Sequence, residues 1–98
     1  MDSSEDSRKQ IIFTLDNVRL DGIEKGRSKT IYKDIERFLM ANGFEHTAGY
    51  VSKEPVKLAE VIAVVGALKN AFPVLNDVVV DMNVTEVWNT YYNFSNKS

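Results

Sequence analysis

The chain has 98 residues, which is enough for one domain with a modest hydrophobic core. Twelve basic and fourteen acidic residues give a formal charge of −2. That balance excludes a generally polycationic protein that coats nucleic acid, although it leaves room for a local basic patch. The chain has no cysteine, which excludes disulfide scaffolds, thiolate zinc sites and cysteine nucleophiles, and its single histidine excludes a histidine-built metal site.

Both ends of the chain are polar. Residues 1–9 are predicted to be a flexible leader and residues 95–98 a tail, so that residues 10–94 form a single domain. No apolar run approaches the roughly 20 residues of a membrane span, and the polar start does not resemble a signal peptide. The sequence therefore predicts a cytoplasmic protein that does not enter a membrane.

The first predicted element is a buried strand over residues 10–16. Ile11, Phe13 and Leu15 alternate with other residues and so lie on one face of it. Residues 18–28 follow with two glycines and many charged side chains. This composition predicts a loop after the strand.

Next comes a predicted amphipathic helix. Ser28 is suited to cap it, and it is expected to end near Asn42 and Gly43, where glycine supplies a left-handed residue. Its apolar positions recur at helical spacing and form one face: Ile31, Ile35, Phe38 and Leu39.

The second half of the chain alternates in the same way. Residues 44–53 are predicted to supply one or two extended segments, and residues 56–71 a second helix that begins after Glu54-Pro55. Residues 74–84 contain three consecutive valines, which favour a central strand. Thr85 is expected to cap a short C-terminal helix that carries Val87, Trp88, Tyr91 and Tyr92.

This order of elements predicts a ferredoxin-like α+β sandwich, with an antiparallel sheet, two helices on one face and a short C-terminal helix. The opposite face of the sheet would then be open. Because a domain this small commonly hides such a face against a second copy, the order also predicts a homodimer.

Asp16 closes the first predicted strand. A carboxylate at the end of a strand can hold a divalent metal ion or act as a general base. Asp and Asn also commonly turn the chain, so Asp16-Asn17 equally fits a turn without chemistry. Asp81, after the valine run, has the same two interpretations, with the turn favoured more strongly.

Basic residues gather between positions 19 and 37, where six of them stand against four acidic residues. Such a segment can hold phosphates, assisted by backbone N–H groups of residues 26–30 at the start of the helix. A solvated loop and the polar face of a helix explain the same charges. The basic residues are Arg19, Lys25, Arg27, Lys29, Lys33 and Arg37.

Two further features allow chemistry or packing. His46 can serve as an acid or base near neutral pH, although a lone histidine on a strand is more often a partly exposed packing residue. Four aromatic residues close together near the C-terminus can stack on RNA bases, but packing on the core or on a second copy is the favoured interpretation. They are Trp88, Tyr91, Tyr92 and Phe94.

One stretch resembles the virulence-associated protein D (VapD) family. Members typically run Tyr-x-Asp-Ile/Leu, an apolar residue, Gly-Phe and then Thr-Gln-Gly-Ser-Val-Tyr. The matching positions here are Tyr32-Lys33-Asp34-Ile35, Leu39, Gly43-Phe44-Glu45, Thr47 and Gly49. The spacing from Phe13 to Tyr32 also fits, and the resemblance spans most of residues 11–92, with its specific part in about twenty of them.

The resemblance implies a homodimeric, toxin-like endoribonuclease, similar to the small ferredoxin-like nucleases of CRISPR spacer acquisition. The family's first strand usually reads Phe-Asp-Leu, with the Asp regarded as functional; Thr14 stands at that position here, and Asp16 follows two residues later. The family's Arg-Asp-Ile-Arg run is replaced by Val79-Val80-Asp81-Met82. Both departures point towards an altered or inactive relative.

The leading hypothesis is therefore a dimeric endoribonuclease in which Asp16 holds Mg²⁺ or Mn²⁺ near the scissile phosphate and Thr14 positions Asp16. Lys25, Arg27 and Lys29 would hold the flanking RNA backbone. The competing hypothesis is an inactive dimeric module that acts through an antitoxin or other protein partner. A third is an RNA binder without catalysis, whose affinity would fall steeply with salt.

Overall fold

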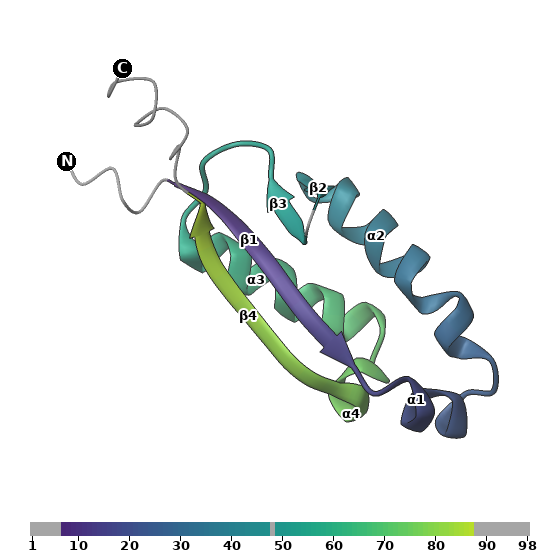
Figure 1. Cartoon of the computed structure of the whole chain (residues 1–98). Helices are drawn as coiled ribbons and strands as arrows, with labels where there is room; N and C mark the ends of the chain where they lie inside the picture. Colours follow the sequence, from purple (N-terminus) through teal and green to yellow (C-terminus); the bar gives the residue numbers. More distant parts are fainter. Residues whose placement is uncertain (1–6, 48, 88–98) are drawn as a thin grey trace, which may run out of the picture.

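The computed structural model describes residues 7–47 and 49–87 (Figure 1). Strands and helices alternate along them, as the hydrophobic periods predict. In chain order they are β1 (Arg8–Leu15), α1 (Asn17–Ile23), the 3₁₀ helix η2 (Arg27–Lys29), α2 (Ile31–Ala41), β2 (Phe44–His46), β3 (Tyr50–Ser52), α3 (Leu58–Ala71), α4 (Leu75–Val78) and β4 (Val79–Val87).

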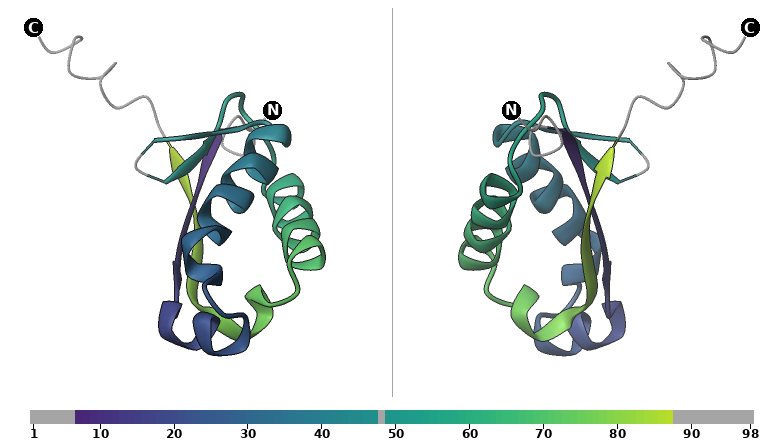
Figure 2. Two further views of the ribbon diagram at one scale, coloured as in Figure 1. Left: turned by 90° about the vertical axis from the view of Figure 1, so that its right-hand side faces the viewer. Right: turned by 90° about the vertical axis from the view of Figure 1, so that its left-hand side faces the viewer.

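The four strands form one sheet in the order β2-β3-β1-β4, and every neighbouring pair is antiparallel. With one long helix between β1 and β2 and another between β3 and β4, this is a ferredoxin-like α+β arrangement. Figure 2 shows that α2 and α3 both lie on one side of the sheet. The predicted fold class and the placement of two helices on one face are confirmed.

The core lies between the sheet and these two helices. β1 turns Ile11 and Leu15 into it, and Ile12 faces outward, as strand alternation requires. α2 contributes a stripe at i, i+4 spacing, and α3 and the segment after it close the other side. The buried apolar residues from these helices include Ile31, Ile35, Leu39, Val61, Leu68, Leu75 and Val78.

The predicted helix over α2 is confirmed at both ends within two residues. It begins at Ile31, directly after Thr30. It ends at Asn42, and Gly43 follows with φ +92°, the left-handed conformation for which glycine was expected. Ser28 itself is not the cap, because it lies within η2.

Several elements differ from the sequence prediction. Residues 75–78, expected in a central strand, form α4, and β4 begins only at Val79 and lies at the edge of the sheet. Residues 18–23, expected in a loop, belong to α1, because Asp16 caps a helix that buries Leu20. β1 begins at Arg8, inside the segment predicted as a leader. β4 runs on through residues 85–87, where a helix cap was predicted, because those residues pair with β1 from Gln10 back to Arg8. The remaining residues of the predicted C-terminal helix lie outside the described residues.

The short strand β3 leaves one edge of β1 uncovered. β3 pairs with β1 only at Gln10 and Ile11, whereas β4 pairs with β1 along its whole length. β3 also approaches β1 closely at Gly49, where a Cβ atom would lie 2.9 Å from the carbonyl oxygen of Ile11. Beyond this contact, the edge of β1 at Phe13 faces the start of α2 instead of a strand.

Within residues 7–47 and 49–87, no helix is long and apolar enough to span a membrane.

Candidate functional site

Asp16, the predicted metal ligand, caps α1. Its Oδ1 accepts a hydrogen bond of 3.0 Å from the backbone N–H of Arg19, and its own N–H donates to the carbonyl of Val78 at 2.8 Å. Thr14 lies one strand position before the end of β1, exposed on the outer face of the sheet and opposite Asp81. Asp16 itself stands outside the strand.

These contacts bear on whether Asp16 suits a divalent ion. Mg²⁺ sites usually combine one or two carboxylates with substrate phosphates and water. In the described part of the chain, no three His, Cys, Asp or Glu side chains gather in a way that could hold a metal ion. A single carboxylate already engaged in capping a helix does not fit such an ion well.

Arg27, predicted to hold RNA, is used inside the protein. Its guanidinium contacts Asp34 of α2 at 2.6 Å and Glu24 at 3.3 Å, and it lies 5.9 Å from the ring centre of Phe72. Only 21% of the side chain is exposed. This arginine therefore fastens η2 to α2 and to the end of α3. Lys25 and Lys29 remain exposed on the same segment.

The backbone around η2 is engaged as well. The N–H of Ser28 donates to Asp21 Oδ1 at 2.8 Å, and those of Lys29 and Thr30 donate to the carbonyls of Gly26 and Arg27. The N–H groups of Ser28, Lys29 and Thr30, which were predicted to assist phosphate binding, are therefore engaged inside the protein. The two hydrogen bonds from Ser28, first its N–H and then its hydroxyl, lower the pKa of Asp21 below its usual range.

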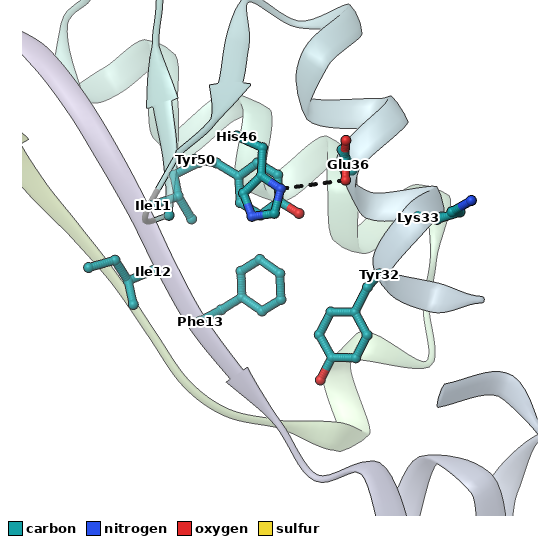
Figure 3. Close-up of a pocket in the computed structure, with 9 residues that line it drawn as sticks. Ile11, Ile12, Phe13, Tyr32, Lys33, Glu36, His46 and Tyr50 are labelled. Atoms are coloured by element: carbon teal, nitrogen blue, oxygen red, sulfur yellow. Dashed lines mark ion pairs between the residues drawn. The ribbon is translucent and has the colours of Figure 1, made fainter. Parts of the chain in front are cut away.

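A pocket of about 370 Å³ lies where the edge of β1 is uncovered (Figure 3). The first two turns of α2 form one wall, and the ends of β2 and β3 form another. Its lining is mostly apolar, with one carboxylate, one ammonium group and the imidazole of the single histidine. The lining residues are Ile11, Ile12, Phe13, Tyr32, Lys33, Glu36, His46, Gly49 and Tyr50.

Four nearly parallel rings run through this pocket. Phe13 of β1 stacks between Tyr32 of α2, at 6.3 Å between ring centres, and Tyr50 of β3, at 5.9 Å. His46 stacks on the other side of the row, 4.5 Å from Tyr50. The rings in the middle are largely covered, whereas Tyr32 is 38% exposed and His46 is exposed. The row therefore presents an exposed ring at each end.

His46 is oriented by a carboxylate. Its Nδ1 lies 3.5 Å from Oε1 of Glu36, one turn after Tyr32 on α2. Figure 3 shows its second ring nitrogen on the opposite side, turned towards the space between Ile11 and Phe13. Burial, and then the charge of Glu36, raise the pKa of Tyr50, so its hydroxyl stays protonated at neutral pH.

The predicted site and the pocket adjoin each other. Tyr32 donates from its hydroxyl to Oδ1 of Asn17 at 2.9 Å, and Asn17 directly follows Asp16. His46 was recognised from the sequence as a possible acid or base, but its partner Glu36 was not. The available signal was the i, i+4 spacing of Tyr32 and Glu36, which places both on one side of α2.

No protein-family model and no curated protein matches this chain. Of the residues quoted for the resemblance to the VapD family, Phe13, Tyr32, Lys33 and Gly49 line the pocket, whereas Asp34, Leu39 and Gly43 do not. Membership of that family stays a prediction.

Proposed function

We propose that the protein is an endoribonuclease of the VapD type that receives single-stranded RNA at this pocket. One observation carries the proposal: Phe13, Tyr32 and Gly49, which the resemblance singles out and which are separated by up to 36 positions, line one cavity of about 370 Å³. That volume is in the range of small-ligand pockets, and it suits a single base or nucleotide better than a duplex.

The exposed ring of Tyr32 supports the choice of RNA. An unstacked base can lie on a tyrosine face whatever its sequence, and such stacking contributes about 1–3 kcal/mol per base. A cation stands at the rim of the pocket, because Lys33 is one of its lining residues. Figure 3 shows the Lys33 ammonium pointing out of the pocket, where it can meet the RNA backbone.

The proposal is tested with end-labelled single-stranded RNA and the purified wild-type chain. Tyr32→Ala, which removes the ring, should weaken RNA binding by about 1–3 kcal/mol and slow cleavage at subsaturating RNA. Tyr32→Phe keeps the ring and loses only the hydroxyl bond to Asn17, so it should bind nearly as wild type does. Absence of any cleavage by the wild-type chain, at high protein concentration with and without Mg²⁺ or Mn²⁺, would contradict the proposal.

The predicted ion at Asp16 needs a variant that spares the helix cap. Asp16→Ser removes the carboxylate but keeps a good capping side chain, whereas Asp16→Ala removes both. If Asp16 holds Mg²⁺ or Mn²⁺, both variants should lose metal-dependent cleavage. If it only caps α1, Asp16→Ser should cleave as wild type does, and Asp16→Ala should lose about 1 kcal/mol of stability.

A second candidate function is an inactive module that binds an antitoxin or other protein partner. It is favoured because Asp16 caps α1 and Arg27 pairs with Asp34, so both side chains already have structural roles. β4 offers such a partner a nine-residue edge, since no described strand pairs with its far side. This module should bind RNA weakly and with little dependence on salt, whereas an RNA-binding enzyme should show a steep salt dependence.

The predicted homodimer also fits that edge better than the outer face of the sheet. The outer face is mostly polar, with Thr14, Asp81, Asn83 and Thr85 exposed on it, so it offers a second copy little apolar surface to bury. Pairing of β4 with β4 of a second copy would extend the sheet. Light scattering of the purified chain, which reports its mass in solution, tests this expectation.

A further inference from the structure

Within the proposed RNA cleavage, on which this inference rests, we infer that His46 is the general base and that Glu36 is its positioning residue. The nucleophile is then the 2′-hydroxyl of the RNA itself, and the reaction needs no metal ion. The geometry of the pocket wall supports this inference: the chain's single histidine meets a carboxylate at one exposed end of the row of four rings.

Two contacts hold the imidazole in one orientation. Oε1 of Glu36, on α2, lies 3.5 Å from Nδ1. The ring of Tyr50, on β3, stacks on the imidazole with 4.5 Å between the ring centres. A base must be held within reach of the proton that it removes, and a carboxylate on the far nitrogen provides this in many acid–base sites. The carboxylate also favours the neutral tautomer with its proton on Nδ1, which leaves Nε2 free to accept.

The free nitrogen faces the cavity. Figure 3 places it on the side of the ring turned away from Glu36, towards Ile11 and Phe13. His46 is 49% exposed and Glu36 40% exposed, so RNA can reach the pair without unfolding of the wall. Tyr32 and His46 stand at opposite ends of the row of rings, so a strand that stacks one base on Tyr32 would run along the row and bring the ribose of a neighbouring nucleotide to the imidazole.

The chemical step balances without another reactant. His46 Nε2 takes the proton of the 2′-hydroxyl as the 2′-oxygen attacks phosphorus, and the bond from phosphorus to the 5′-oxygen breaks. The imidazolium then returns that proton to the departing 5′-oxygen. The products are one RNA end with a 2′,3′-cyclic phosphate and another with a free 5′-hydroxyl.

The alternative of catalysis through Asp16 and a metal ion has different products and requirements. Water activated by an ion would leave a 3′-hydroxyl or a linear phosphate and would cut a strand that lacks the 2′-hydroxyl. The two mechanisms therefore separate on three readouts: chelation, a 2′-deoxy substitution at the cut position, and the chemistry of the new ends.

The experiment uses the full chain and a short RNA whose cut position has been mapped with wild type. With EDTA present, wild type should still cleave, should yield cyclic phosphate ends, and should fail on RNA that carries 2′-deoxyribose at the cut position. His46→Gln should lower kcat by about a hundredfold or more, since a positioned general base contributes about 10²- to 10⁴-fold. Its KM should change little.

Glu36→Gln tests the positioning role. It keeps the shape of the side chain but loses the charge on Nδ1, so kcat should fall, less than in His46→Gln, with KM unchanged. Adding His46→Gln to it should lower kcat no further than His46→Gln does alone, because both act through one imidazole. Met40→Gln, on an exposed part of α2 outside the pocket, is the matched control and should cleave as wild type does.

The outcomes separate the two proposals. If wild type cleaves and His46→Gln cleaves equally well, or if the products carry no cyclic phosphate, the role of His46 is overturned while the endoribonuclease stands. If wild type does not cleave under any condition, both are overturned. Circular dichroism of each variant shows whether a loss of kcat comes from unfolding; a folded His46→Gln without activity supports the inference.

Discussion

Two ion pairs on the same helix, whose carboxylates stand two residues apart at Asp34 and Glu36, have opposite surroundings. Asp34 of α2 meets Arg27 at 2.6 Å in a partly covered contact, with Thr30 and the ring of Phe72 completing the shell around the guanidinium. Glu36 meets His46 at 3.5 Å beside an open pocket. The first pair joins elements of the fold, and the second leaves a nitrogen facing a cavity. Charges that look equivalent in sequence therefore separate into structural and candidate catalytic groups.

The largest effect on the pocket side is expected from Gly49→Ala. The new Cβ would lie 2.9 Å from the carbonyl oxygen of Ile11, so β3 must move away from β1. Such overpacking should cost about 1–3 kcal/mol of unfolding free energy and should disturb the wall that holds His46. Urea unfolding measures the cost. Gly22→Ala in α1, where a Cβ meets no atom within 4 Å, is the control and should not destabilise the protein.

The next largest effect on stability is expected from breaking the ion pair between Arg27 and Asp34. Arg27→Ala removes the bonds to Asp34 and Thr30 and the contact with Phe72, and leaves a partly buried carboxylate with only the exposed Arg37, 3.9 Å away, as its cation. We expect a loss of about 1–2 kcal/mol in urea unfolding. Lys25→Ala, on the same segment but exposed, should stay within about 0.5 kcal/mol of wild type. Equal losses in the two variants would refute the structural role of Arg27.

The pocket pair should behave in the opposite way. Because both partners are about half exposed, His46→Gln should change the unfolding free energy by less than about 1 kcal/mol, although it abolishes most of the proposed cleavage. Thermal unfolding and RNA cleavage, measured on the same preparation, give the comparison directly. A large loss of stability would show that this pair, like Arg27 and Asp34, has a structural role.

The smallest expected effect is a change in the unfolding free energy at acidic pH. Because hydrogen bonds from Ser28 lower the pKa of Asp21, ionised Asp21 stabilises the fold above pH about 3.8, and this contribution is lost as pH falls through the lowered value. Asp21→Asn should therefore be less stable than wild type at neutral pH, and the difference should shrink on acidification. Unfolding curves at neutral and strongly acidic pH measure it; a gap that does not change with pH would contradict the assignment.

Local patterns predicted much of the fold. The spacing of Ile31, Ile35 and Leu39, with Gly43 after them, specifies α2 and its end because periodicity and the left-handed cap are properties of neighbouring residues. The same reasoning failed at Thr85, a good helix cap by type. There, pairing with Gln10 across the sheet outweighs the local preference, and that partner is far away in sequence.

The candidate site shows the same division. Phe13, Tyr32 and Gly49 were recognisable from the resemblance, and His46 from its chemistry, but nothing near His46 in the chain identifies Glu36 as its partner. The contact exists because the β2–β3 hairpin folds back beside α2, with Gly49 close against β1. Likewise, only the packing of η2 against α2 and Phe72 shows that Arg27 is occupied.

The sequence by itself determined the class of this protein's fold, because hydrophobic period and turn chemistry act over a few residues. The tertiary structure alone decided which polar groups are satisfied internally and which face a cavity. Whether a polar group is satisfied depends on contacts between segments tens of residues apart, because a charged side chain pairs with the groups that lie next to it in space.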